Sequence, residues 1–140
     1  MNPPDLAEEK SVAVAVASGQ DIVTARMRGR GLATQMGFPA TTATLIATAI
    51  SELARNILLY AGRGEIVLST IEHGERRGIA VVARDQGPGI TDVPRAMEDG
   101  YSTSGRLGLG LPGVRRLMDD FEIRSRAGEG TTVVTKKWNS

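Results

Sequence analysis

The chain contains no cysteine, only one histidine and few aromatic side chains, which make up 4% of its 140 residues. Without cysteine the protein has neither disulfide bonds nor a thiolate metal site. The net charge is only +1 at pH 7, which gives no strong field for binding nucleic acid or an anionic membrane. We therefore expect no nucleic-acid partner and no membrane partner.

Long hydrophobic runs are also absent. The apolar stretches are interrupted within a few residues, far short of the ~20 residues that span a bilayer. Residues 1–10 are charged and contain two prolines, so they lack the apolar core of a signal peptide. We expect a soluble cytoplasmic protein in which residues 1–10 form a flexible tail and residues 11–140 form a single domain.

Hydrophobic periodicity predicts the order of helices and strands. The strongest signal lies in residues 41–61, where apolar side chains recur every three or four residues, as they do along the buried stripe of a helix. Two further helices are predicted at 21–36 and 111–120, and strands at 11–17, 65–72, 78–84, 121–126 and 131–138. This order predicts an α+β fold, a two-layer sandwich with a mixed, mostly antiparallel sheet that helices cover on one face.

A carboxylate and a carboxamide lie one turn apart on the helix predicted at 41–61. Glu52 and Asn56 project from the same face because residues four apart are neighbours on a helix surface. The carboxylate could accept a proton from a hydroxyl group, and the carboxamide oxygen could bind Mg²⁺. The alternative is that Glu52 pairs with Arg55 or Asn56 on a solvated surface. For an isolated pair this alternative is the better one.

Asp85 follows the strand predicted at 78–84, at the point where the chain turns. A carboxylate fixed there can accept a hydrogen bond from an exocyclic amine such as that of adenine. Gly87 and Gly89 would let the backbone approach the base closely. An ordinary turn explains the same residues equally well. Thr131 and Thr132 begin the last predicted strand, where threonine is common, and one of them could also hydrogen-bond a base.

The segment 86–113 contains seven glycines and three prolines, which is typical of a long functional loop. Glycines at 105, 108, 110 and 113 lead into a predicted helix, so backbone N–H groups there could bind phosphate. The chain has no Gly-Lys dipeptide, which excludes a Walker A loop. A G-x-G-x-x-G pattern is present, but it follows a polar loop instead of a strand, so a dinucleotide-binding unit is not expected.

Together, these motifs resemble those of the GHKL family, which includes DNA gyrase, Hsp90, histidine kinases and MutL. The resemblance covers residues 45–134 and implies the family's ATP-binding fold, with ATP and Mg²⁺ as cofactors. It implies a catalytic role for Glu52, Mg²⁺ binding by Asn56 and recognition of the adenine amine by Asp85. The other nucleotide contacts that it implies are Gly87, Gly89, Ser104, Gly105, Arg106, Leu107, Gly108, Leu109, Gly110, Thr131 and Thr132, with Arg106 as a candidate contact to the γ-phosphate.

Within this family, the chain is most similar to the anti-sigma-factor serine kinases and to the switch kinases of bacterial stressosomes. No segment supplies the phosphoacceptor histidine that a histidine kinase would need. The resemblance therefore implies a serine/threonine kinase whose substrates are STAS-domain proteins, with a downstream phosphatase as a further possible partner.

Three questions stay open at this level. The chain could be an anti-sigma factor or an ATP-dependent binding module without essential kinase activity. It could also hydrolyse ATP, with Glu52 activating water. Arg26, Arg28 and Arg30 form a basic cluster on the first predicted helix, which is either a solvated surface or a docking surface for an acidic partner.

Overall fold

The computed structural model of the chain describes residues 11–90, 93–97 and 110–139. Five strands form one sheet in the order β1-β2-β3-β5-β4. The strands are β1 (Ser11–Val16), β2 (Gly64–His73), β3 (Arg76–Asp85), β4 (Asp120–Arg126) and β5 (Gly130–Asn139). The helices are α2 (Gly19–Gln35), α3 (Ala40–Ala61), α4 (Val93–Ala96) and α5 (Gly110–Leu117). None of these helices is long and apolar enough to cross a membrane.

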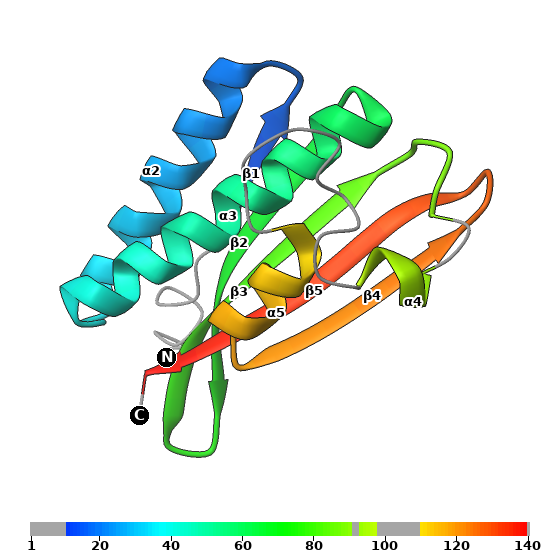
Figure 1. Cartoon of the computed structure of the whole chain (residues 1–140). Coiled ribbons are helices and arrows are strands. Elements are labelled where there is room, and N and C mark those ends of the chain that lie inside the picture. Colours follow the sequence, from blue (N-terminus) through cyan, green and yellow to red (C-terminus); the bar gives the residue numbers. More distant parts are fainter. Residues whose placement is uncertain (1–10, 91–92, 98–109, 140) are drawn as a thin grey trace.

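Helices α2, α3 and α5 lie on one face of the sheet, so the predicted α+β sandwich is confirmed (Figure 1). All four strand pairings among the described residues are antiparallel, which makes the sheet more uniform than the mixed one that we expected. The cause lies in the connections. Tight hairpins join β2 to β3 and β4 to β5, and the two helices between β1 and β2 bring the chain back antiparallel.

The segment predicted as one long loop at 86–113 contains two helical pieces, α4 and the start of α5. Helix α5 begins at Gly110 and ends at Leu117, whereas the sequence predicted 111–120. Its first residues are buried, and Pro112 lies in the first turn, where a missing N–H costs little. The helix ends early because β4 already begins at Asp120.

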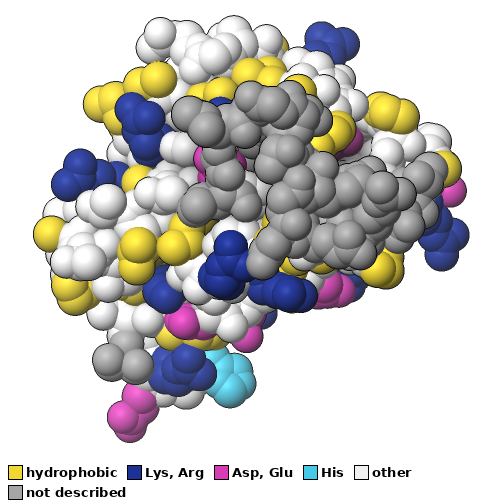
Figure 2. Space-filling model, in the orientation of Figure 1, with side chains coloured by type: hydrophobic (Ala, Val, Ile, Leu, Met, Phe, Trp, Pro, Cys, Tyr) yellow, Lys and Arg dark blue, Asp and Glu magenta, His cyan; other side chains and the backbone are white. Residues whose placement is uncertain are grey.

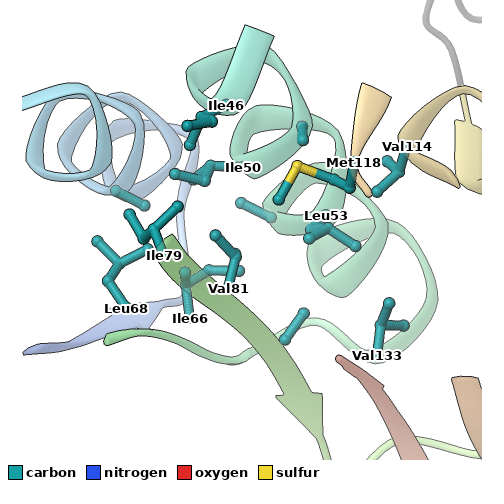
Figure 3. Close-up of a cluster of buried hydrophobic side chains, with 14 of the residues drawn as sticks. Ile46, Ile50, Leu53, Ile66, Leu68, Ile79, Val81, Val114, Met118 and Val133 are labelled. Atoms are coloured by element: carbon teal, nitrogen blue, oxygen red, sulfur yellow. The ribbon is translucent and has the colours of Figure 1, made fainter. Parts of the chain in front are cut away.

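Helix α3 supplies the centre of the hydrophobic core. Ile46, Ile50 and Leu53 point from α3 toward the sheet (Figure 3). The sheet, α5 and the residue that follows α5 contribute the side chains that face them: Ile66, Leu68, Ile79, Val81, Val114, Met118 and Val133. Helix α2 packs closely on α3 because Gly29 lies against Ile50, and a Cβ atom at Gly29 would overlap the Ile50 Cδ1 atom. A glycine that weakens α2 on its own therefore permits this close packing.

We expect Ile50→Ala to lower the free energy of unfolding by about 2–5 kcal/mol, because it removes a fully buried side chain from the centre of this core. Leu59→Ala on the same helix is the matched control, since 46% of Leu59 is exposed. Urea unfolding followed by circular dichroism measures both variants. Equal losses in the two variants would contradict the assignment of Ile50 to the core.

Candidate functional site

A small pocket, partly open to solvent, lies between α3 and the ends of β3 and β5. Most of its wall is apolar, and a few polar side chains face it, which is the usual composition of a small-molecule site. The lining residues are Leu53, Asn56, Ile57, Tyr60, Ala83, Asp85, Gly89, Ile90, Leu111, Thr131 and Val133. The cavity therefore brings together residues from three of the sequence motifs.

Asp85 is the last residue of β3 and is held in a fixed orientation. Its Oδ1 atom accepts a hydrogen bond of 2.8 Å from the Gly87 N–H group. Thr131, at the start of β5, is its direct partner across the two strands, so both side chains project from the same face of the sheet. Thr132 is the next residue along β5 and projects from the opposite face, where it pairs with Arg84. Of the two threonines, only Thr131 lines the cavity.

The loop after β3 packs tightly against its surroundings. Gly89 has a φ of +81°, and a Cβ atom there would overlap the backbone carbonyl of Arg126. This conformation and this close approach both require glycine. Gly87 lies against Ala61 at the end of α3, again without room for a side chain. A hydrogen bond of 2.6 Å from the Gly128 N–H group to the Pro88 carbonyl joins this loop to the β4–β5 turn.

Asn56 lines the cavity, and its side chain is anomalous. Both the Oδ1 and the Nδ2 atoms are buried, and neither has a hydrogen-bond partner among the described residues. Buried polar groups are nearly always satisfied, because an unpaired one costs about 1–3 kcal/mol. An unpaired carboxamide in the wall of a cavity points to a ligand that supplies the missing partners.

A Mg²⁺ ion fits this position chemically, because a carboxamide oxygen is one of the ligands that the ion accepts. No group of three or more His, Asp or Glu side chains in the described ranges could hold a metal ion. An ion at Asn56 would therefore draw further oxygen ligands from water or from a bound phosphate, which is the usual arrangement for Mg²⁺ at nucleotide sites.

Glu52 lies one turn before Asn56 and is only 5% exposed. Its Oε1 atom accepts a hydrogen bond of 3.2 Å from the Gly110 N–H group at the start of α5. Its Oε2 atom forms an ion pair of 2.5 Å with the Arg55 Nη1 atom. The pairing with Arg55 that we considered as an alternative is therefore present, but it does not lie on a solvated face. The carboxylate connects α3 to the N-terminus of α5.

The structure describes some of the remaining residues that were predicted to bind a ligand or a partner, and others lie outside the described ranges. Gly110 begins α5 and is buried against α3. The predictions at Ser104, Gly105, Arg106, Leu107, Gly108 and Leu109 fall outside the described residues. The arginines at 26, 28 and 30 are exposed on α2. On the side of the described chain shown in Figure 2, Lys and Arg side chains stand at separate places with Asp and Glu among them.

The sequence reasoning missed two features of the site. Leu53 and Ile57 form part of the cavity wall, although their helical spacing indicated only a core position. Ser125 on β4 hydrogen-bonds residues in the loop after β3 and at the start of β5, both of which border the cavity. The alternation along β4 carried a signal for it, because Phe121, Ile123 and Ser125 share the inner face and only the serine is polar.

The sequence matches the histidine kinase-like ATPase domain family over residues 15–137. The chain therefore belongs to this family, and the identification from the four motifs is confirmed. It is similar to the serine/threonine-protein kinase RsbT of Bacillus subtilis (strain 168), with 54% identity over 118 residues that cover 84% of this chain and 89% of that protein.

Anti-sigma F factors are more distant relatives. The chain is 32% identical over 99 residues to that of Thermoanaerobacter sp. (strain X514), which covers 66% of this chain and 68% of the relative. It is 29% identical over 120 residues to that of Priestia megaterium, with 81% of each protein covered. Both groups of relatives fall within the classes that the motifs indicated.

Proposed function

We propose that the protein is an ATP-dependent serine/threonine kinase that transfers the γ-phosphate of MgATP to a STAS-domain regulator in stressosome-type bacterial stress signalling. The observation that carries this proposal is the buried carboxamide of Asn56, which has no hydrogen-bond partner in the part of the chain that the structure describes. It lies in a cavity that Asp85 also lines, one helical turn from Glu52. The similarity to the RsbT kinase over most of both chains supports the reaction type. We also propose a downstream phosphatase as a further partner.

Phosphoryl transfer requires mainly that the reacting groups are positioned and that charge is stabilised. In this proposal, Asp85 accepts a hydrogen bond from the adenine amine, and the apolar wall formed by Leu53 and Ile57 contacts the base. Glu52 orients the acceptor hydroxyl and takes its proton as the oxygen–phosphorus bond forms, while ADP leaves with the electrons of the broken bond. Mg²⁺ held by Asn56 would neutralise negative charge on the phosphates.

A second function, partner binding with ATP as a conformational ligand, is favoured by the similarity to anti-sigma F factors. The exposed arginines at 26, 28 and 30 offer a surface for an acidic partner. Charge reversal at these three positions, with phosphoryl transfer and partner capture measured separately, distinguishes the two functions. Loss of capture with unchanged transfer to a peptide acceptor would identify α2 as a docking surface only.

The direct test of the proposed reaction uses γ-labelled ATP, Mg²⁺ and purified STAS-domain proteins from the same organism. We expect label on a serine or threonine of one STAS protein, and we expect no label when that residue is replaced by alanine. Release of free phosphate without a labelled protein would favour an ATP hydrolase instead. Binding of ATP with neither product would favour the binding module.

Asp85→Asn is expected to lower the affinity for ATP by about 10- to 100-fold, because one carboxylate oxygen becomes an NH₂ donor that cannot accept a hydrogen bond from the base. Isothermal titration calorimetry with ATP measures the loss. Glu65→Gln is the matched control, since Glu65 pairs with Arg84 on the outer face of the sheet. Equal affinities for the Asp85 variant and the wild-type protein would exclude Asp85 as a base contact.

A further inference from the structure

Ser125 on β4 forms three short contacts that join the loop after β3 to the start of β5, beside the cavity. Its Oγ atom accepts a hydrogen bond of 2.7 Å from the Ile90 N–H group, in the loop after β3. It lies 3.1 Å from the carbonyl oxygen of Gly130 and 2.7 Å from the Oγ1 atom of Thr131, both at the start of β5. Ile90 and Thr131 line the cavity, so the serine lies directly behind its wall.

The protons of these groups can be assigned by counting. A hydroxyl group has one proton to donate and can accept two hydrogen bonds, whereas a carbonyl oxygen can only accept. The Ser125 proton must therefore point at the Gly130 carbonyl. The 2.7 Å contact between the two hydroxyl groups then needs the proton of Thr131, which donates to the Ser125 oxygen. This is the one assignment that makes all three contacts hydrogen bonds.

The assignment fixes what Thr131 can offer to a ligand. Its only proton is used by Ser125, so toward the cavity the threonine oxygen can accept hydrogen bonds and cannot donate one. Asp85 lies directly across from Thr131 on β3, and its carboxylate is likewise an acceptor. Two acceptors side by side suit an NH₂ group, which has two protons. They repel a carbonyl oxygen at the same place.

We propose that Ser125 is a positioning residue that determines base selectivity. It holds the Thr131 proton, so that Asp85 and Thr131 form a pair of hydrogen-bond acceptors. This pair selects a purine with an amine at position 6 over a purine with a carbonyl at that position. This inference rests on the proposed nucleotide site, but it requires only that a nucleotide binds there. It does not depend on phosphoryl transfer.

The test compares binding of ATP with binding of inosine triphosphate, which carries a carbonyl at position 6 of the base, to the full-length protein. The affinity ratio of the two nucleotides is measured by calorimetry in Mg²⁺. We expect the wild-type protein to favour ATP. In Ser125→Ala the Thr131 hydroxyl becomes free to rotate and donate, so the ratio is expected to fall about tenfold, the value of one hydrogen bond.

Three further variants separate selectivity from a structural effect. Ser125→Thr keeps the hydroxyl group and is expected to keep the ratio. Ser125→Cys keeps the size of the side chain with a much weaker donor, and its ratio is expected to fall even if the alanine variant does not fold. Ser69→Ala removes a serine hydroxyl on β2 that donates an exposed hydrogen bond to the Ser11 hydroxyl, and it is expected to leave the ratio unchanged.

An equal loss of affinity for both nucleotides in the alanine and cysteine variants would overturn the proposal, because it would assign Ser125 a role in loop packing alone. An unchanged ratio in both would do the same. If the wild-type protein binds neither nucleotide, the selectivity and the ATP site fall together. If the ratio shifts as expected but no protein is phosphorylated, the selectivity stands and the kinase proposal falls.

Discussion

Glu52→Gln is expected to reduce phosphoryl transfer at least ~100-fold, the usual size of a general-base effect, while ATP affinity changes little. The substitution keeps the size of the side chain and an oxygen that can accept the Gly110 N–H hydrogen bond. It removes the group that takes the proton of the acceptor hydroxyl. Single-turnover transfer from labelled ATP to the STAS protein measures the rate, and calorimetry measures nucleotide binding on the same preparation.

Two controls make this result specific to the missing base. Arg55→Gln removes the ion pair with Glu52 but retains the carboxylate, so its loss of rate is expected to be much smaller. Glu72→Gln neutralises a glutamate on β2 that is 60% exposed, and it is expected to have no effect. Normal transfer by the Glu52 variant would exclude Glu52 as the base. Equal losses in the Glu52 and Arg55 variants would assign the effect to the ion pair.

The layers of the fold were predicted well, because the residues with strong hydrophobic periodicity are the ones that are buried in the core. The helix predicted at 41–61 and the observed α3 differ by one residue at the start, since its apolar stripe faces both the sheet and α5. The end of α5 was placed too late. The helical pattern in residues 118–120 is weak, and these residues do not continue the helix. Asp120 instead pairs with Lys136 and begins β4.

The site was predictable as a set of motifs but not as a geometry. The order of carboxylate, carboxamide, aspartate and glycine segments indicated a nucleotide site before any fold was known. Successive side chains of β5 point to opposite faces of the sheet, so the register of the strand decides which threonine faces the cavity. The pairing of Asp85 with Thr131 follows from the register of two strands that are distant in sequence. Neither can be derived from residue types alone.

The same limit explains why Ser125 was overlooked. Its role depends on three partners: Ile90, 35 residues away in the loop after β3, and Gly130 and Thr131, five and six residues away at the start of β5. On β4 itself it is one polar residue in an alternating strand. Residues that touch a ligand often stand out by type, whereas residues that orient them are recognised only from their contacts.

Asn56 connects stability with the proposed function. Its buried carboxamide has no hydrogen-bond partner within residues 11–90, 93–97 and 110–139, and a buried polar group without a partner destabilises the ligand-free protein. Asn56→Leu keeps the number of side-chain heavy atoms and their branching, and it removes both polar atoms. It is therefore expected to raise the free energy of unfolding of the ligand-free protein by about 1 kcal/mol. Phosphoryl transfer is expected to fall at least ~100-fold, because the variant lacks the ligand for the metal ion that stabilises the phosphate charge.

Urea unfolding without nucleotide and single-turnover transfer with MgATP measure these two opposite changes in one variant. Asn139→Leu is the matched control, because the Asn139 Nδ2 atom donates a hydrogen bond of 3.3 Å to the Met36 carbonyl. Loss of this hydrogen bond should leave the free energy of unfolding unchanged or lower it, and phosphoryl transfer should be unaffected. A less stable ligand-free Asn56 variant would mean that the carboxamide is already satisfied without a ligand. Unchanged transfer would exclude Asn56 as a metal ligand, since no step would then depend on its oxygen.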